Sequence, residues 1–222
     1  MHSYKIVFCG VLFLFTATAQ SQIMAISEKG DTVYLFNDGT WSFSPDFGKE
    51  VFEELSFLDM ELDIQDNPEV FMVPDKSDKE VNFNDKIVIH YNSSDWDRTP
   101  PGLYNAEAEF AWTSKNEDFY CITIIEEVGL GLENIVKIAI DNLNASSSDE
   151  VEIIKLQRRT VNNKELILGV FKLDIKGMDI TYCGYYYSDG EFTIQHLTYT
   201  HSSIFDQKLP EMMDLLNGLV IK

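Results

Sequence analysis

Four apolar, strand-like segments follow one another between residues 151 and 200, separated only by short turn sequences. Asn162-Asn163 and Asp189-Gly190 are turn pairs that tolerate positive φ, and Gly177 separates the middle segments. Connections this short favour antiparallel neighbours, because parallel strands need a long crossover. The pattern therefore predicts an antiparallel meander, in which the second strand is central because it is apolar on both faces, with strands at 151–161, 166–175, 180–187 and 192–200.

Two segments with helical periodicity accompany these strands. Apolar residues recur at i, i+3, i+4, i+7, i+8 and i+11 from Leu132 to Leu143, which predicts an amphipathic helix. A second apolar face runs from Phe205 to Val220, and Pro210 favours a regular helix that begins there, since proline suits the first helical position. Three further strands are expected before the first helix, at 87–91, 107–113 and 119–125.

Together these elements predict an α+β domain over residues 83–222, an antiparallel β-sheet flanked by two amphipathic helices in an α/β/α sandwich. The element order, the aromatic hairpin Tyr182-Cys183-Gly184-Tyr185-Tyr186-Tyr187 and the terminal helix resemble the PsbP/DcrB-like α/β/α sandwich. The resemblance implies a binding or accessory protein without enzymatic activity, as most members of that fold are. It is carried by the pattern alone, so it transfers no site residues to this chain.

The N-terminus has the features of a cleavable signal peptide. His2 and Lys5 precede an apolar run from Ile6 to Phe15, and small residues follow up to Ala19. The run is too short to cross a bilayer, which needs about 20 apolar residues. The alternative is a buried strand or core helix. We expect a signal peptide at 1–19, cleavage after Ala19 or after Ser21, and an exported periplasmic or extracellular protein without a transmembrane span.

Two segments are expected between the leader and the main domain. Residues 20–47 predict a small β-hairpin unit, and its string Asn37-Asp38-Gly39-Thr40-Trp41 resembles a short module of exported Bacteroidetes-type proteins. Residues 48–82 contain 11 acidic residues and 3 lysines, which predicts an acidic linker. A cation site within 75–85 is the alternative for part of that linker, although the run lacks the glycine and the closing glutamate of an EF-hand loop.

The net charge restricts the partners. The chain carries a formal charge of −20, and cleavage after Ala19 removes one lysine and no acid, which gives 16 − 37 = −21. A surface this negative repels nucleic acid and anionic lipid and favours basic partners or cations. Solubility alone is the alternative explanation of the charge. We therefore expect no nucleic-acid partner.

The last hairpin contains the one candidate for catalytic chemistry. A two-residue Asp189-Gly190 turn would pair Ser188 with Glu191 and therefore Cys183 with His196, which could form a nucleophile with its base or two metal ligands. An oxyanion site and further ligands are not visible in the sequence, and the neighbouring apolar residues indicate a core face. A buried thiol beside an imidazole is the preferred interpretation. Cys121 and Cys183 are expected to stay unbonded.

Other catalytic signatures are missing from the sequence, so we expect no catalytic residues, no cofactor and no metal. The expected partner-binding surface consists of four aromatic residues, Tyr182, Tyr186, Tyr199 and Trp96, and the tyrosines are structural instead if helices cover the hairpin. The function expected is an exported, non-enzymatic accessory or binding module for an unknown protein or envelope component. The alternatives are an acidic inhibitor or immunity-type protein that masks a basic partner, and a hydrolase with a non-motif site.

Overall fold

The structure is a computed structural model, and it describes residues 23–26, 32–35, 41–42, 60–116 and 119–222. The chain divides into two compact units, Met1–Leu55 and Ser56–Lys222. The described part of the first unit is a three-stranded antiparallel sheet of β1 (Ile23–Ile26), β2 (Thr32–Leu35) and β3 (Trp41–Ser42). The expected signal peptide lies outside the described residues.

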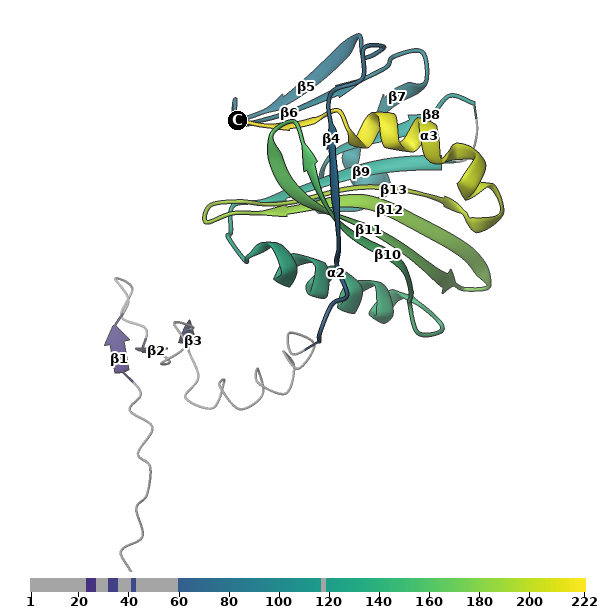
Figure 1. The fold of residues 1–222 in the computed structure, drawn as a ribbon. Helices are drawn as coiled ribbons and strands as arrows, with labels where there is room; N and C mark the ends of the chain where they lie inside the picture. The colour runs from purple at the N-terminus through teal and green to yellow at the C-terminus, as the bar shows by residue number, and fades with distance from the viewer. Residues whose placement is uncertain (1–22, 27–31, 36–40, 43–59, 117–118) are drawn as a thin grey trace, which may run out of the picture. The chain divides into compact units, whose positions relative to one another are not determined.

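The second unit is built on an eight-stranded sheet with the order β4-β10-β11-β12-β13-β9-β8-β7 (Figure 1). Neighbouring strands are antiparallel except β4 and β10, which are parallel. The predicted meander is confirmed, and β11 is central as expected. The bounds are β4 (Gln65–Phe71), β7 (Trp96–Thr99), β8 (Ala108–Ser114), β9 (Phe119–Glu126), β10 (Glu152–Val161), β11 (Lys164–Ile175), β12 (Met178–Ser188) and β13 (Thr193–His201).

Helices cover both faces of this sheet, which confirms the predicted sandwich (Figure 1). Helix α2 (Leu132–Ser146) packs on one face, and α3 (Phe205–Leu216) packs on the other. A small antiparallel sheet of β5 (Lys79–Phe83), β6 (Ile87–Tyr91) and β14 (Leu219–Ile221) shares the α3 side. Strand alternation sends successive apolar residues to two separate cores, one on each face.

The segment expected to be an acidic linker contributes two strands to the folded unit. β4 pairs with β10, and β5 pairs with β6, although both strands lie within 48–82 apart from the last residue of β5. β4 is an edge strand whose side chains are mostly exposed, so its acids and Pro68 are compatible with backbone pairing on one side. The folded unit therefore begins before residue 83.

The C-terminal helix differs from expectation at both ends. It begins at Phe205, after the 3₁₀ turn η3 (Ser202–Ile204), where the His201 ring accepts a hydrogen bond from the Ser203 N–H. Pro210 lies inside the helix on its exposed side, where the loss of one backbone hydrogen bond does not disturb the core. The helix ends at Leu216, and Gly218 lets the chain pass close to the His90 carbonyl before β14 begins.

The turn between β12 and β13 is two residues longer than expected. Ser188 pairs with Thr193, so Cys183 lies opposite Thr198, and the predicted Cys183–His196 pairing is wrong. The Asp189 carboxylate accepts hydrogen bonds from the N–H groups of Glu191 and Phe192, and this side chain closes a four-residue turn. A shift of two residues leaves every side chain on its predicted face.

The Asn162-Asn163 turn has the predicted tight geometry. Both residues have positive φ, 46° and 66°, and Val161 pairs with Lys164 across the turn. The Asn162 side chain is buried and joins three distant segments: it accepts from the Val73 N–H and donates to the carbonyls of Asn217 and Leu219. Among the described residues, no helix is long and apolar enough to cross a membrane.

Candidate binding groove

Helix α2 is too narrow to cover its face of the sheet. A helix is about 10 Å wide, whereas eight strands spaced about 4.8 Å apart span about 34 Å. α2 packs on β11 and β12, so the part of this face formed by β13, β9 and β8 is left to smaller elements (Figure 1). The short 3₁₀ helix η2 (Pro101–Leu103) packs against β8. A groove lies between α2 and the residues that follow η2.

Four tyrosines form a row beside the floor of this groove. Tyr182, Tyr199 and Tyr120 are in register on three neighbouring strands, and Tyr104 follows η2. The ring centroids are 5.0 Å apart from Tyr182 to Tyr199, 5.4 Å from Tyr199 to Tyr120 and 4.9 Å from Tyr120 to Tyr104. The Tyr104 hydroxyl also lies 2.6 Å from the Thr113 Oγ1 of β8, which ties the end of the row to the sheet.

The rest of the floor is apolar except for Gln195, and no side chain of the lining carries a charge. Leu197 and Ile122 lie side by side in the next row of the sheet, followed by Gln195 and Ile124. The cavity has a volume of about 210 Å³. The lining contains no acidic or basic side chain, although the net charge of the chain is −20. Helix α2 contributes one wall of the groove, which consists of Ala139, Asn142, Leu143 and Ser146.

Three tyrosines of the groove, Tyr182, Tyr186 and Tyr199, keep their protons at neutral pH. Burial raises the pKa of the Tyr182, Tyr186 and Tyr199 hydroxyls above the ordinary value, because the charged phenolate would lose its hydration. None of these three hydroxyls makes a hydrogen bond to another described residue. They are therefore neutral groups with free hydrogen-bonding capacity beside an apolar floor. We call this site, lined by Tyr182, Tyr186, Tyr199, Tyr104 and the α2 wall, the tyrosine groove.

The structure brings three of the four residues expected at the binding surface together in this groove. Tyr182 and Tyr199 are half-buried, and Tyr186, which also lines the groove, is 1% exposed. Trp96 does not belong to the site. It is the first residue of β7 and is 2% exposed. Its ring packs edge-on against Phe119 in the core on the α3 side, with the ring centroids 5.0 Å apart. The assignment of Trp96 to a contact surface is therefore wrong.

Sequence reasoning missed Tyr120, Tyr104, Asn142 and Gln195. Strand alternation could have found Tyr120, since it shares a face with Ile122 and Ile124 in a segment correctly predicted as a strand. Tyr104 gave no such signal, because it follows an irregular Pro-Pro-Gly loop whose return to the sheet depends on tertiary packing.

The single described cysteine–histidine contact is sealed in the core. His196 Nε2 donates to the Leu215 carbonyl at 3.3 Å, and Nδ1 lies 2.8 Å from the Thr123 hydroxyl and 3.7 Å from the Cys121 sulfur. Burial lowers the pKa of His196 to about 4 and raises that of Cys121 well above the ordinary value. This pair supplies neither a thiolate nor a base that titrates near neutral pH, which agrees with the preferred interpretation, although the thiol is Cys121 rather than Cys183.

The two described cysteines are free and cannot bridge. Cys121 and Cys183 are both opposite Thr198, one on each side of β13. Two strand spacings separate their Cα atoms by about 9–10 Å, which exceeds the roughly 7 Å limit of a disulfide.

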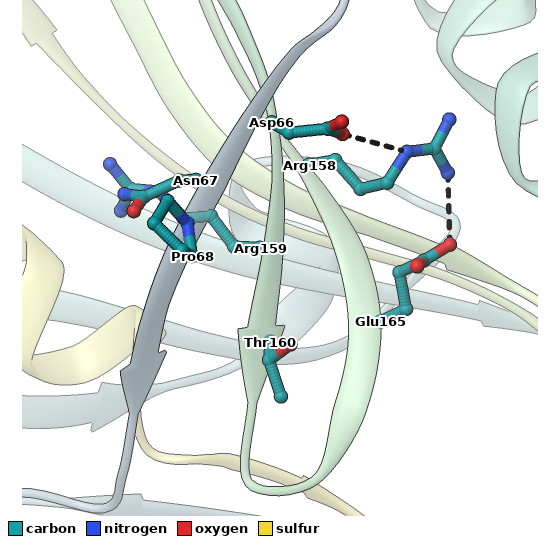
Figure 2. A pocket seen from close by; sticks show the side chains of 7 residues that line it. All are labelled: Asp66, Asn67, Pro68, Arg158, Arg159, Thr160 and Glu165. Atoms are coloured by element: carbon teal, nitrogen blue, oxygen red, sulfur yellow. Dashed lines mark hydrogen bonds and ion pairs between the residues drawn. The ribbon is translucent and has the colours of Figure 1, made fainter.

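A second cavity of about 460 Å³ lies at the β4 edge and surrounds Arg158 (Figure 2). Figure 2 shows the carboxylates of Asp66 and Glu165 directed at two different nitrogens of the Arg158 guanidinium. The nitrogen–oxygen distances are 3.6 Å to Asp66, 2.9 Å to Glu165 and 2.9 Å to Glu133 of α2. Arg159, the next residue along β10, points to the other face of the sheet, where it contacts Tyr185. Arg158 is already paired with three carboxylates, so this cavity is a poor anion site.

The part of the chain that the structure describes contains no group of three or more His, Cys, Asp or Glu side chains placed to hold a metal ion. The cation site considered as an alternative at 75–85 has no such cluster within that part. Asp78 instead accepts hydrogen bonds from the backbone N–H and the hydroxyl of Ser93, and these bonds lower its pKa.

Comparisons with known proteins concern the fold. No protein-family model matches the chain, and no curated protein matches it. The chain is similar to cyanobacterial PsbP (CyanoP) from Synechocystis sp. PCC 6803, with 12% identity and a TM-score of 0.50 over 68% of this chain and 95% of that one. It is also similar to LpqN of Mycobacterium tuberculosis, described as involved in cell envelope biogenesis, with 12% identity and a TM-score of 0.47 over 65% of this chain and 90% of that one. The similarity to CyanoP establishes a PsbP-like fold, which confirms the resemblance found in the sequence.

Proposed function

We propose that this protein is an exported, non-enzymatic binding module, and that the tyrosine groove holds part of a protein or other component of the cell envelope. The observation that carries the proposal is the groove itself. It combines an apolar floor with neutral hydroxyls that have no partner among the described residues. Binding sites typically consist of a concave apolar surface with a few well-placed polar groups, and tyrosine is enriched at binding hot spots.

Export is supported by the sequence of the first 19 residues, with its basic start, short apolar run and small residues before the cleavage position. The two free cysteines do not stabilise the domain by a bridge. Its stability in an extracytoplasmic compartment would therefore come from the two apolar cores.

A binding role is favoured over catalysis by the state of the titratable groups. Catalysis needs such groups held together in a pocket with pKa values suited to proton transfer or attack. The lining of the tyrosine groove contains no carboxylate, lysine, arginine, histidine or cysteine, and His196 with Cys121 is sealed in the opposite core.

Capture from an envelope extract with two matched variants tests the proposal. Leu143→Lys places a charged chain in the α2 wall of the groove, whereas Val70→Lys makes the same type of change on β4, where Val70 is 59% exposed. We expect the immobilised mature protein to retain one saturable component, Leu143→Lys to lose it and Val70→Lys to keep it. Equal capture by both variants would contradict the groove as the site.

The acidic surface supports a second candidate, an inhibitor that masks a basic partner. Salt distinguishes the two candidates in the same capture experiment. A partner held by the net charge is released as ionic strength rises, because exposed charges are screened within about 10 Å at 0.1 M salt. A partner held in the uncharged groove stays bound.

A further inference from the structure

The tyrosine groove contains more unpartnered hydrogen-bonding groups than a purely apolar contact requires. The hydroxyls of Tyr182, Tyr186 and Tyr199 and the side-chain amides of Asn142 and Gln195 line it, and none of these five groups bonds to another described residue. In the part of the chain that the structure describes, the buried side-chain polar atoms without a partner are Thr99 Oγ1 and Trp112 Nε1, so the polar atoms of these five groups are open to solvent. A ligand that supplies donors and acceptors can replace the water at these groups while it covers the apolar floor.

The chemistry of these five groups selects a ligand that both donates and accepts hydrogen bonds. A neutral phenol hydroxyl donates one bond and accepts others, and a carboxamide does both through separate atoms. A polyhydroxylated ring has the same dual character at every hydroxyl. Its C–H faces can also rest on the apolar floor formed by Leu197 and Ile122.

The absence of charged side chains in the lining favours an uncharged ligand. A cationic ligand would find no carboxylate in the groove, and an anionic one would meet the field of a chain with a net charge of −20. An uncharged ligand avoids both costs.

The geometry disfavours an extended or proline-rich peptide. The ring faces of Tyr182, Tyr199 and Tyr120 stack on one another at interplanar angles of 23° and 30°, so they do not form the open aromatic slots that hold prolines. The groove also lies on the face of the sheet formed by β12, β13 and β9. Each of these strands is already paired on both sides, so a peptide cannot add to the sheet here as a further strand. Its volume of about 210 Å³ is below the roughly 300 Å³ lower limit of sites that enclose a drug-sized ligand.

We infer that the tyrosine groove binds one unit of an uncharged saccharide, with the remainder of the glycan outside the groove. This inference rests on the proposed function and names the ligand class of the same site. Tyr182, Tyr186 and Tyr199 hold the sugar hydroxyls, Asn142 and Gln195 fix its orientation, and the apolar floor takes its C–H face.

Calorimetric titration of the mature protein tests this inference. The probes are uncharged oligosaccharides of glucose, mannose, galactose and N-acetylglucosamine, polygalacturonate as an acidic saccharide, and an uncharged proline-rich peptide. We expect at least one uncharged oligosaccharide to bind with an affinity that is the same at low and high salt, and the acidic saccharide and the peptide to bind more weakly.

Three tyrosine-to-phenylalanine variants locate the site. Tyr182→Phe and Tyr199→Phe keep the stacked rings and remove only hydroxyls without a described partner, so each should weaken saccharide binding about 2- to 10-fold with unchanged thermal stability. Tyr187→Phe, on the same strand but the opposite face, should bind like the wild type.

Failure of the inference differs from failure of the proposed function. No binding to any uncharged oligosaccharide, or binding that the two groove variants leave unchanged, overturns the saccharide assignment. The proposed function survives that result if Leu143→Lys still abolishes capture of an envelope component. If neither saccharide binding nor envelope capture depends on the groove, both are wrong.

Discussion

The side chain of Asn162 should contribute an unusually large share of the stability for one turn residue. Its Oδ1 accepts from the Val73 N–H at 2.9 Å, and its Nδ2 donates to the carbonyls of Asn217 and Leu219 at 2.8 Å each. These three bonds join the β10–β11 turn to the segment after β4 and to the approach to β14. At about 1 kcal/mol net for each bond, Asn162→Gly should lower the free energy of unfolding by about 3 kcal/mol.

The neighbouring residue provides a matched control. Asn163 also has positive φ, at 66°, and it is exposed and makes no side-chain hydrogen bond to a described residue. Glycine tolerates positive φ at both positions and adds similar freedom to the unfolded chain. The difference between Asn162→Gly and Asn163→Gly therefore isolates the three bonds.

Equilibrium unfolding in urea, followed by far-UV circular dichroism, measures both variants. The midpoint should fall much further for Asn162→Gly than for Asn163→Gly, with similar slopes. A difference between the variants below about 1 kcal/mol would refute the assignment, because it is less than the three bonds together should contribute.

Three further predictions follow from the described residues and the leader. The pKa of the His196 imidazole is about 4 in the folded protein, whereas its ordinary value is 6.5. Between these two pH values the unfolded state binds a proton that the folded state does not bind. The contribution of neutral His196 to the free energy of unfolding is therefore complete above pH 6.5 and falls by about 3 kcal/mol as the pH drops to 4. The fall should be smaller in His196→Gln, measured by urea unfolding at several pH values, and an unchanged pH dependence in that variant would contradict the assignment. Titration with a thiol reagent should detect both Cys121 and Cys183 after denaturation without reductant and neither before it, since both are buried, and zero thiols after denaturation would show a bridge. Mass spectrometry of the protein from its native host should find a chain that begins after Ala19 or Ser21, whereas an intact Met1 would contradict export by this leader.

The elements with strong periodicity could be predicted from the sequence. The four meander strands and α2 differ from their predicted bounds by at most three residues, because each buries a continuous apolar face. The sheet face of each residue in the β12–β13 hairpin was also predicted correctly, although the register of the two strands was not. A displacement of two residues keeps inward and outward positions unchanged, so Tyr182, Tyr186 and Tyr199 were correctly placed on one face.

The parts that could not be predicted depend on tertiary contacts. β4 has little apolar pattern, since it is an edge strand held by backbone bonds to β10, and its acids point to solvent. Trp96 looked like part of a polar loop because its neighbours are Asp95, Asp97 and Arg98, but its own ring is the first core residue of β7. The tyrosine groove exists because one helix leaves part of the sheet uncovered, which depends on the number of strands and not on a local motif.

Site-specific photo-crosslinking in the native host tests the central claim that the tyrosine groove is the binding site. A photoreactive amino acid at position 143 stands in the groove wall, and the same amino acid at position 70 stands on the distant β4 edge. We predict a discrete crosslinked product from position 143 that is absent from position 70. A product from position 70 alone, or none from position 143 when the protein is exported and folded, would contradict it.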